Sequence, residues 1–288
     1  MKRRLLLGAV FLIGAAALIL RSLLGLHNVA PGAEPLDGDP DAVFDAVLQA
    51  HVFVDGVDYE GLAQNEGLRR YAATLSTWGP RTAVTAFPDD DARLAYYINA
   101  YNALTLLGVV DHWPIDSIQD VRGRIEPKPG FGFFFAQRFR LDGKTVDLYR
   151  LENDTIRGFG DARIHAAINC ASASCPTLES RAFRADDLQA RLDAATRNFV
   201  STPPHVAVVD GELRLSSIFQ WFAGDFEQHA ARLGKPADVR SFIAAFATPE
   251  VAAAVQAARN ADLPIVYVDY DWSLNRRGNV AAAPKESE

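Results

Sequence analysis

Residues 163–176 bring a histidine and both cysteines of the chain into one short stretch, RIHAAINCASASCP. The apolar run Ile164 to Cys170 carries His165 and predicts a buried β-strand. A loop of four small residues then separates Cys170 from Cys175. Buried polar and reactive groups need hydrogen-bond partners, so the surrounding chain must fold to supply them. We therefore expect the functional site to form around this stretch.

Four arrangements of this stretch are open, one of which is two free, buried thiols. In an oxidising compartment, two cysteines five positions apart predict a Cys170–Cys175 disulfide that locks the loop beside His165. Alternatively, Cys175 is a nucleophile activated by His165. Side chains alternate along a strand, so Cys170 would point away from His165, whereas Cys175 could fold back onto the histidine's face. A weaker alternative makes His165, Cys170 and Cys175 zinc ligands, and the same alternation counts against it. We expect no other metal site and no cofactor.

Asn99, Asn102 and Glu152 are the expected partners of His165. Residues 87–113 have apolar side chains at helical spacing and predict a core helix that carries both asparagines on one face. A buried amide needs hydrogen-bond partners, which either local structure or a site can supply. Glu152 lies among apolar positions of a second, shorter predicted helix. Any of the three could orient the imidazole, so they join Cys175 and His165 as candidate catalytic residues.

The remaining chain predicts helices interleaved with hairpins. Asp142-Gly143 and Asp210-Gly211 are turn dipeptides between alternating segments, and each predicts a β-hairpin. This mixture predicts an α+β fold in which a mostly antiparallel sheet packs against helices. We expect one domain over residues 39–275, preceded by a linker over 27–38 and followed by a disordered tail over 276–288.

Residues 1–26 predict a membrane anchor or a signal peptide. Lys2, Arg3 and Arg4 precede sixteen uncharged residues, and the span reaches Leu26 if the side chain of Arg21 snorkels. A basic flank stays on the cytoplasmic side of a membrane. We therefore expect an inner-membrane protein with a single anchor and a periplasmic body. The alternative is secretion to the periplasm after signal cleavage.

The charge of the chain argues against nucleic acid as a partner. The formal net charge is −7, and it becomes −11 without the four cations of residues 1–26. Binding to nucleic acid depends on lysine and arginine side chains that neutralise phosphates, and an acidic body lacks that excess. The expected partners are the membrane, through the N-terminal segment, and an unknown envelope substrate or protein.

Five motifs occur in a fixed order along the chain. They are YINAYN at 97–102, RIH at 163–165, NCASASCP at 169–176, IFQWF at 218–222 with Asp225-Phe226, and YDWSLN at 270–275. As a set they resemble the bacterial family called domain of unknown function 547, over about Asp39 to Asn275. The resemblance implies no established activity, and many members of that family are exported or membrane-anchored.

A helix with asparagines followed by a strand that begins with histidine is also similar to the papain/transglutaminase-like cysteine hydrolases. In those enzymes a helix presents the nucleophile and a strand presents the base. This chain departs from the pattern, because Asn99 or Asn102 stands where a cysteine is expected. The resemblance implies a distantly related fold and a cysteine hydrolase or transferase that acts on an amide or thioester. The alternative is a non-catalytic envelope binding or scaffold domain in which the Cys170–Cys175 disulfide is a structural clip.

Overall fold

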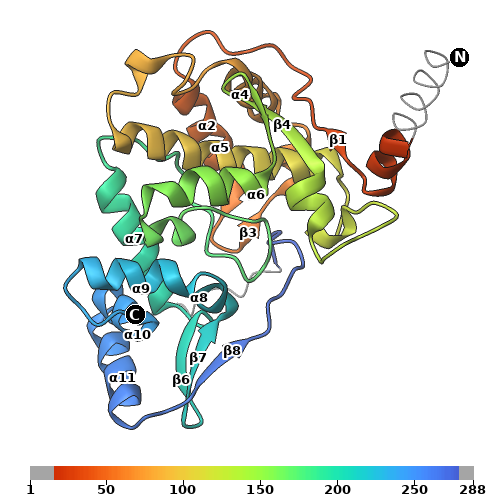
Figure 1. Cartoon of the computed structure of the whole chain (residues 1–288). Helices are drawn as coiled ribbons and strands as arrows, with labels where there is room; N and C mark the ends of the chain where they lie inside the picture. Colours follow the sequence, from red (N-terminus) through yellow and green to blue (C-terminus); the bar gives the residue numbers. More distant parts are fainter. Residues whose placement is uncertain (1–15, 279–288) are drawn as a thin grey trace, which may run out of the picture.

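The computed structural model describes residues 16–278. It confirms the predicted α+β class: helices predominate, and the strands form small sheets (Figure 1). Three sheets are present among the described residues, with strand orders β1-β4-β5, β2-β3 and β6-β7-β8. The β1–β4 and β7–β8 pairs are parallel, and the other three pairs are antiparallel. The strands are β1 (His27–Asn28), β2 (Val52–Phe53), β3 (Gly56–Val57), β4 (Gln137–Leu141), β5 (Lys144–Val146), β6 (Val206–Val209), β7 (Glu212–Ser216) and β8 (Ile265–Val268).

Helix α5 (Asp90–Asp111) is the centre of the first hydrophobic core. The carboxylate of Asp89 caps it by accepting a hydrogen bond from the amide of Ala92, and two further acids in the first turn suit the positive helix end. Sixteen of its residues are buried, so it contacts the core on nearly every side. Around it pack α3 (Tyr59–Ala63), α4 (Glu66–Thr77) and α6 (Leu148–Arg150), and α2 (Pro40–His51) packs in turn against α4 and α3.

A second core forms in the C-terminal half, drawn in cyan and blue in Figure 1. Its centre is a group of contacting phenylalanine rings, Phe199, Phe219, Phe226 and Phe242, with centroids 4.8–4.9 Å apart. The Asp210-Gly211 turn joins β6 to β7, and both residues have positive φ, as a two-residue hairpin turn requires. The helices of this half are α7 (Leu188–Ser201), α8 (Ser217–Trp221), α9 (Ala223–Arg232), α10 (Val239–Phe246) and α11 (Pro249–Asn260).

The predicted strand over Ile164 to Cys170 was wrong. Residues Ala162–Ala166 form a 3-10 helix, η6, and the chain then continues without regular structure to Cys175. The carboxylate of Asp161 caps η6 by accepting a hydrogen bond from the amide of Arg163. A short apolar run rich in alanine has no periodicity that distinguishes a strand from a buried helical turn. Without a strand there is no alternation of side chains, so nothing in the backbone favours Cys175 over Cys170 as the nucleophile.

η6 lies where the two cores meet. Ile164 and Ala167 belong to the first core, whereas Ala162 and Ala166 belong to the second. The side chain of His165, between them, is only 3% exposed. The histidine is thus held from both sides by packed apolar side chains.

The structure contradicts the predicted transmembrane anchor and the inner-membrane location. Within residues 16–278, no helix has both the length and the apolar character needed to cross a bilayer. Residues 1–15 of the predicted anchor lie outside the described residues. In the predicted linker, His27 and Asn28 form β1, and Val29 is buried. In the predicted tail, Arg276 pairs with Val57, and residues 279–288 lie outside the described part.

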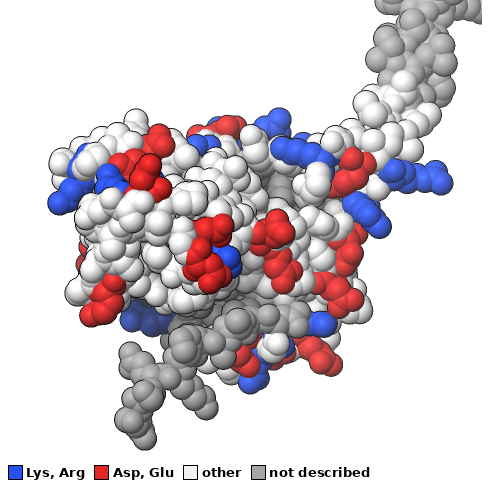
Figure 2. Space-filling view, turned by 90° about the horizontal axis from the view of Figure 1, so that it is seen from below, with Lys and Arg blue, Asp and Glu red and all other residues white. Residues whose placement is uncertain are grey.

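Charged side chains are scattered on the face shown in Figure 2. Aspartate and glutamate lie there in small separate groups, with lysine and arginine among them and uncharged side chains between. On this face the acidic side chains are therefore spread out instead of being gathered in one patch.

Candidate functional site

A cavity of about 490 Å³ lies beside His165 and both cysteines. It draws its walls from both halves of the chain, because α5 and α8 each contribute side chains. Two π-helical segments, η3 (Gly132–Ala136) and η4 (Leu151–Ile156), supply further lining, and such segments are frequent at functional sites. The lining includes Tyr101, Phe134, Phe135, Tyr149, Glu152, Asn153, His165, Ile168, Cys170, Cys175, Ile218, Trp221, Phe222, Tyr270 and Trp272.

Asp225 holds the imidazole of His165 in place. Its Oδ2 atom lies 2.9 Å from Nε2 of His165, and Arg157 binds both carboxylate oxygens at 2.7 and 2.8 Å. The carboxyl is partly buried, which raises its pKa, but the hydrogen bonds and charges of His165 and Arg157 together hold that pKa well below its usual range. Asp225 is therefore ionised and can only accept the hydrogen bond from the ring.

This hydrogen bond selects the tautomer of His165. Because Asp225 accepts, Nε2 carries the proton, and Nδ1 is the ring nitrogen with a lone pair. Burial lowers the pKa of His165, and the neighbouring carboxylate only partly opposes that effect. The ring also stacks on Phe222, with centroids 4.1 Å apart. The arrangement gives a neutral, fixed imidazole that can accept a proton at Nδ1.

Cys170 lies in a group of hydrogen-bonding side chains. Its sulfur is 2.9 Å from the hydroxyl of Ser172 and 3.2 Å from the hydroxyl of Tyr270. Burial acts to raise the pKa of the Cys170 thiol, but hydrogen bonds from Cys175, Ser172 and Tyr270 outweigh it, and the pKa is lowered. Cys170 thus has the character of a reactive thiolate.

Cys175 has the opposite character. Its sulfur lies 3.0 Å from the backbone nitrogen of Cys170, which donates to it. Burial and the hydrogen bond to the Cys170 sulfur raise the pKa of Cys175 well above the usual value for a thiol. Both residues are free cysteines, so the disulfide expected between them is not formed in the structure.

Glu152 also faces the cavity, from η4. Burial raises the pKa of its carboxyl to about 7, and the negative charge of Cys170 adds to the effect. Tyr101 donates a hydrogen bond of 3.4 Å to its Oε2 atom. A carboxyl with a pKa near neutrality can give or take a proton at the pH at which most enzymes work. Cys175, His165 and Glu152, three of the residues predicted from the sequence, thus line one cavity.

Asn99 and Asn102 do not line the cavity. The amide of Asn102 donates to the carbonyl of Ala167 at 3.0 Å and accepts from the backbone nitrogen of Asn169 at 2.8 Å. Asn99 binds the backbone of Phe183 in the same two-way manner, with both distances 2.8 Å. Each asparagine side chain thus makes the two hydrogen bonds to the backbone that a neighbouring β-strand would otherwise have made.

Further amides hold the cysteine loop itself. The side chain of Asn169 donates to the carbonyl of Pro176 at 2.7 Å and accepts from the amide of Ala171 at 2.8 Å. Asn275, from the end of the described chain, donates to the same Asn169 oxygen at 3.1 Å. Ala171 has a φ of 64°, an uncommon value for alanine. The loop conformation therefore depends on contacts from α5 and from the C-terminal segment.

The weaker zinc alternative is not supported by the geometry. Among the described residues, the ligand atoms of His165, Cys170 and Cys175 do not form a group within reach of one metal ion. Asp225, Arg157 and Tyr270 were not predicted from the sequence as site residues. Asp225 and Tyr270 lie within the family-like motifs, which was the signal available, but no local pattern links them to a histidine 60 residues or more away.

A comparison with protein families matches part of the chain. No curated protein and no solved structure matches the chain. The similarity to papain/transglutaminase-like cysteine hydrolases is not shown by these comparisons. Residues 85–200 match the family model described as "Protein of unknown function, DUF547". The matched range includes α5, His165 and both cysteines but not Asp225. This match supports the family that the motifs indicate.

Proposed function

We propose that the protein is a cysteine hydrolase or acyltransferase that acts on an amide or thioester. The observation that carries the proposal is the cavity that Cys170 shares with a histidine oriented by a carboxylate. A nucleophile, a base and a group that orients the base are the three parts that covalent acyl transfer requires. Cys170 replaces Cys175 as the proposed nucleophile, because its pKa is the one that is lowered.

In the first half of the proposed reaction, the Cys170 thiolate attacks the carbonyl carbon of the substrate. A carbon–sulfur bond forms, and the bond to the leaving amine or thiol breaks. The leaving group takes a proton from the Glu152 carboxyl, whose raised pKa keeps part of it protonated near neutral pH. The product of this half is a thioester between the acyl group and Cys170.

In the second half, water attacks this thioester. Nδ1 of His165 takes one proton from the water, and the acyl group leaves as a carboxylic acid while the Cys170 thiolate is restored. The proton on His165 then returns to Glu152. Asp225 stabilises the transient imidazolium, because an ionised carboxylate faces Nε2. An amine or thiol in place of water would make the reaction an acyl transfer.

The cavity lining suggests the kind of acyl group. Most lining side chains are aromatic or aliphatic, so an apolar acyl chain or an aromatic group would be desolvated there. Lys128 also lines the cavity, and its ammonium lies 4.1 Å from the centre of the Phe135 ring. An anionic group on the substrate would be attracted to this charge.

Intact-protein mass spectrometry after incubation with a small acyl thioester tests the proposal. We expect one acyl group on the wild type, mapped to Cys170 by peptide analysis. Cys170→Ala should abolish the adduct, whereas Cys175→Ala, the matched control, should still be acylated. Equal acylation of Cys170→Ala and wild type would exclude Cys170 as the nucleophile. No adduct and no turnover with a panel of thioesters and amides would exclude the reaction class.

A further inference from the structure

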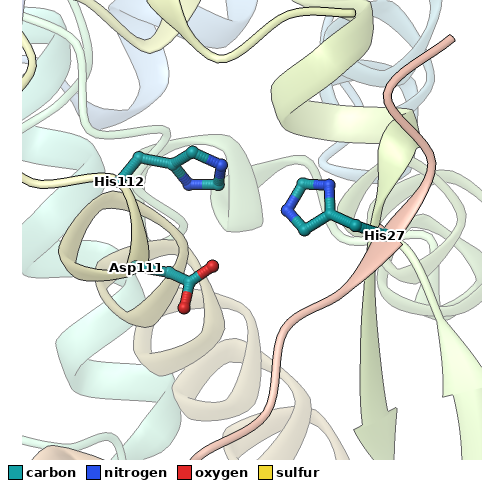
Figure 3. A group of neighbouring side chains, drawn as sticks. All are labelled: His27, Asp111 and His112. Atoms are coloured by element: carbon teal, nitrogen blue, oxygen red, sulfur yellow. The ribbon is translucent and has the colours of Figure 1, made fainter. Parts of the chain in front are cut away.

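A second site lies away from the cysteines, where β1 meets the end of α5. His27 is in β1, which pairs in parallel with β4, while Asp111 and His112 are the last residue and the C-cap of α5. Figure 3 shows the two imidazole rings pointing toward each other, with the Asp111 carboxylate beside the gap between them. The C-terminal end of a helix carries partial negative charge and attracts cations. In the sequence, His27 lies more than 80 positions before Asp111 and His112.

Each of the two rings has one nitrogen bound to the backbone. Nδ1 of His27 lies 2.7 Å from the carbonyl oxygen of Gly25, and Nδ1 of His112 lies 3.0 Å from that of Gly108. A carbonyl can only accept, so both Nδ1 atoms carry protons. In the neutral rings, Nε2 is then a lone-pair donor. Metal-binding histidines have this second hydrogen bond to a carbonyl or carboxylate, which fixes the ring and its tautomer.

The outward nitrogen of His27 lacks a partner among residues 16–278. Nε2 of His27 is buried, and no residue in that range forms a hydrogen bond with it. The ring centroids are 5.2 Å apart with an interplanar angle of 69°. Two ring nitrogens that can each offer a lone pair therefore lie close to one carboxylate. A cation placed among them could bind to all three groups.

We propose that His27, Asp111 and His112 bind a divalent transition-metal ion of the zinc class. One ligand atom from each residue lies within 4.8 Å of the other two. Tetrahedral zinc with ligands at about 2.0–2.2 Å places them roughly 3.4 Å apart, so small side-chain rotations complete the site. The carboxylate of Asp111 is exposed, so water can take the fourth position. Two imidazoles and one carboxylate suit this class of metal better than magnesium or calcium, which prefer oxygen ligands.

Such an ion would join two parts of the fold. β1 contacts the body of the protein mainly through its short pairing with β4, and it follows the helical residues 16–23. A metal bridge from His27 to Asp111 and His112 would attach β1 to the end of the central helix. The bound ion would then stabilise the folded chain, because the unfolded chain has no preformed site.

The test uses the untagged full chain after treatment with EDTA. Isothermal titration with Zn²⁺ should give one site per chain, and Zn²⁺ should raise the melting temperature. Co²⁺ should give visible absorption of a four- or five-coordinate ion, without the near-ultraviolet sulfur charge-transfer band that cysteine ligation produces. Asp111→Asn, at an exposed position, should weaken zinc binding about tenfold or more without changing the fold. His27→Gln and His112→Gln should abolish the thermal shift.

Two controls separate this site from the cysteines and from general surface binding. Asp186→Asn removes another exposed carboxylate and should bind Zn²⁺ as the wild type does. The double variant Cys170→Ser/Cys175→Ser should also keep the site and its Co²⁺ spectrum. Zinc binding of wild-type strength in Asp111→Asn and in both histidine variants would overturn the assignment. Absence of any zinc binding by the wild type at micromolar concentrations would do the same.

Discussion

Nε2 of His165 lies 2.9 Å from Oδ2 of Asp225, and this contact joins the two halves of the protein. The histidine is on η6, which packs against both cores, and the aspartate is in the first turn of α9. Arg157, from the segment after η4, binds the same carboxylate. The orientation of the imidazole therefore depends on the correct docking of elements from three parts of the chain.

Asp225→Asn should leave the protein folded and reduce acyl transfer. The amide cannot hold the Nε2–H tautomer of His165 as a carboxylate does, so the base loses orientation and charge stabilisation. We expect a loss of about 10²–10⁴-fold in turnover of an acyl thioester. Glu227→Gln, two residues along α9, is the matched control and should keep wild-type turnover. An unchanged rate in Asp225→Asn would mean that His165 is not the base.

Alkylation of Cys170 by iodoacetamide should extend to lower pH than for an ordinary thiol. The pKa of Cys170 is lowered by its hydrogen-bond donors, so thiolate persists as the pH falls below the usual thiol range of about 8.5. Tyr270→Phe removes one donor and should move the pH profile of the alkylation rate upward. Tyr267→Phe, in β8, should leave the profile unchanged. A Tyr270→Phe profile that coincides with the wild type would contradict the role assigned to this hydroxyl.

Ionisation of Glu152 should lower the free energy of unfolding as the pH rises from about 4.5 to about 7. The pKa of this carboxyl is raised in the folded state to about 7 from 4.5, mainly by burial, so the folded chain binds the proton more tightly than the unfolded chain. The contribution of the protonated Glu152 carboxyl to the free energy of unfolding is therefore fully present below the pKa of the unfolded state. It is lost as the pH rises through the pKa of the folded state.

The comparison that isolates this effect is wild type against Glu152→Gln in urea denaturation at pH 5 and pH 8. Relative to the variant, we expect the wild type to lose on the order of 1–3 kcal/mol of unfolding free energy between the two pH values. Glu227→Gln should follow the wild type at both. A difference of the opposite sign would show that the folded state favours the charged carboxylate.

Asn102→Ala should destabilise the fold. It leaves the carbonyl of Ala167 and the amide of Asn169 buried without their partner, at a cost of about 2–5 kcal/mol. Because these atoms begin the cysteine loop, the rate at which iodoacetamide alkylates Cys170 should also differ between the variant and the wild type. Asn260→Ala, at an exposed helix end, should change the unfolding free energy by less than about 0.5 kcal/mol. A neutral Asn102→Ala would show that the loop backbone finds other partners.

The sequence by itself determined the elements whose signals are local. Asp210-Gly211 adopts positive φ in two consecutive residues, which only a short list of dipeptides tolerates, so the hairpin was predictable. The acids after Pro88 and the position of Pro114 likewise bracket α5, because capping and proline sterics act within one turn. The candidate site at residues 163–176 was predicted from residue types alone, since both thiols and a histidine occur there.

The tertiary structure decided the conformation and the surroundings of those residues. Ile164 to Cys170 has too few residues to reveal a period, and the side chain of Asn102 replaces a strand partner, so a helical turn and an irregular loop form where a strand was predicted. Hydrogen bonds from Cys175, from Ser172 and from a tyrosine 100 residues away lower the pKa of Cys170, and an aspartate 60 residues away orients His165. Hydrogen bonds and desolvation act over a few ångströms of space, and only the packing of the two cores brings these residues within that range.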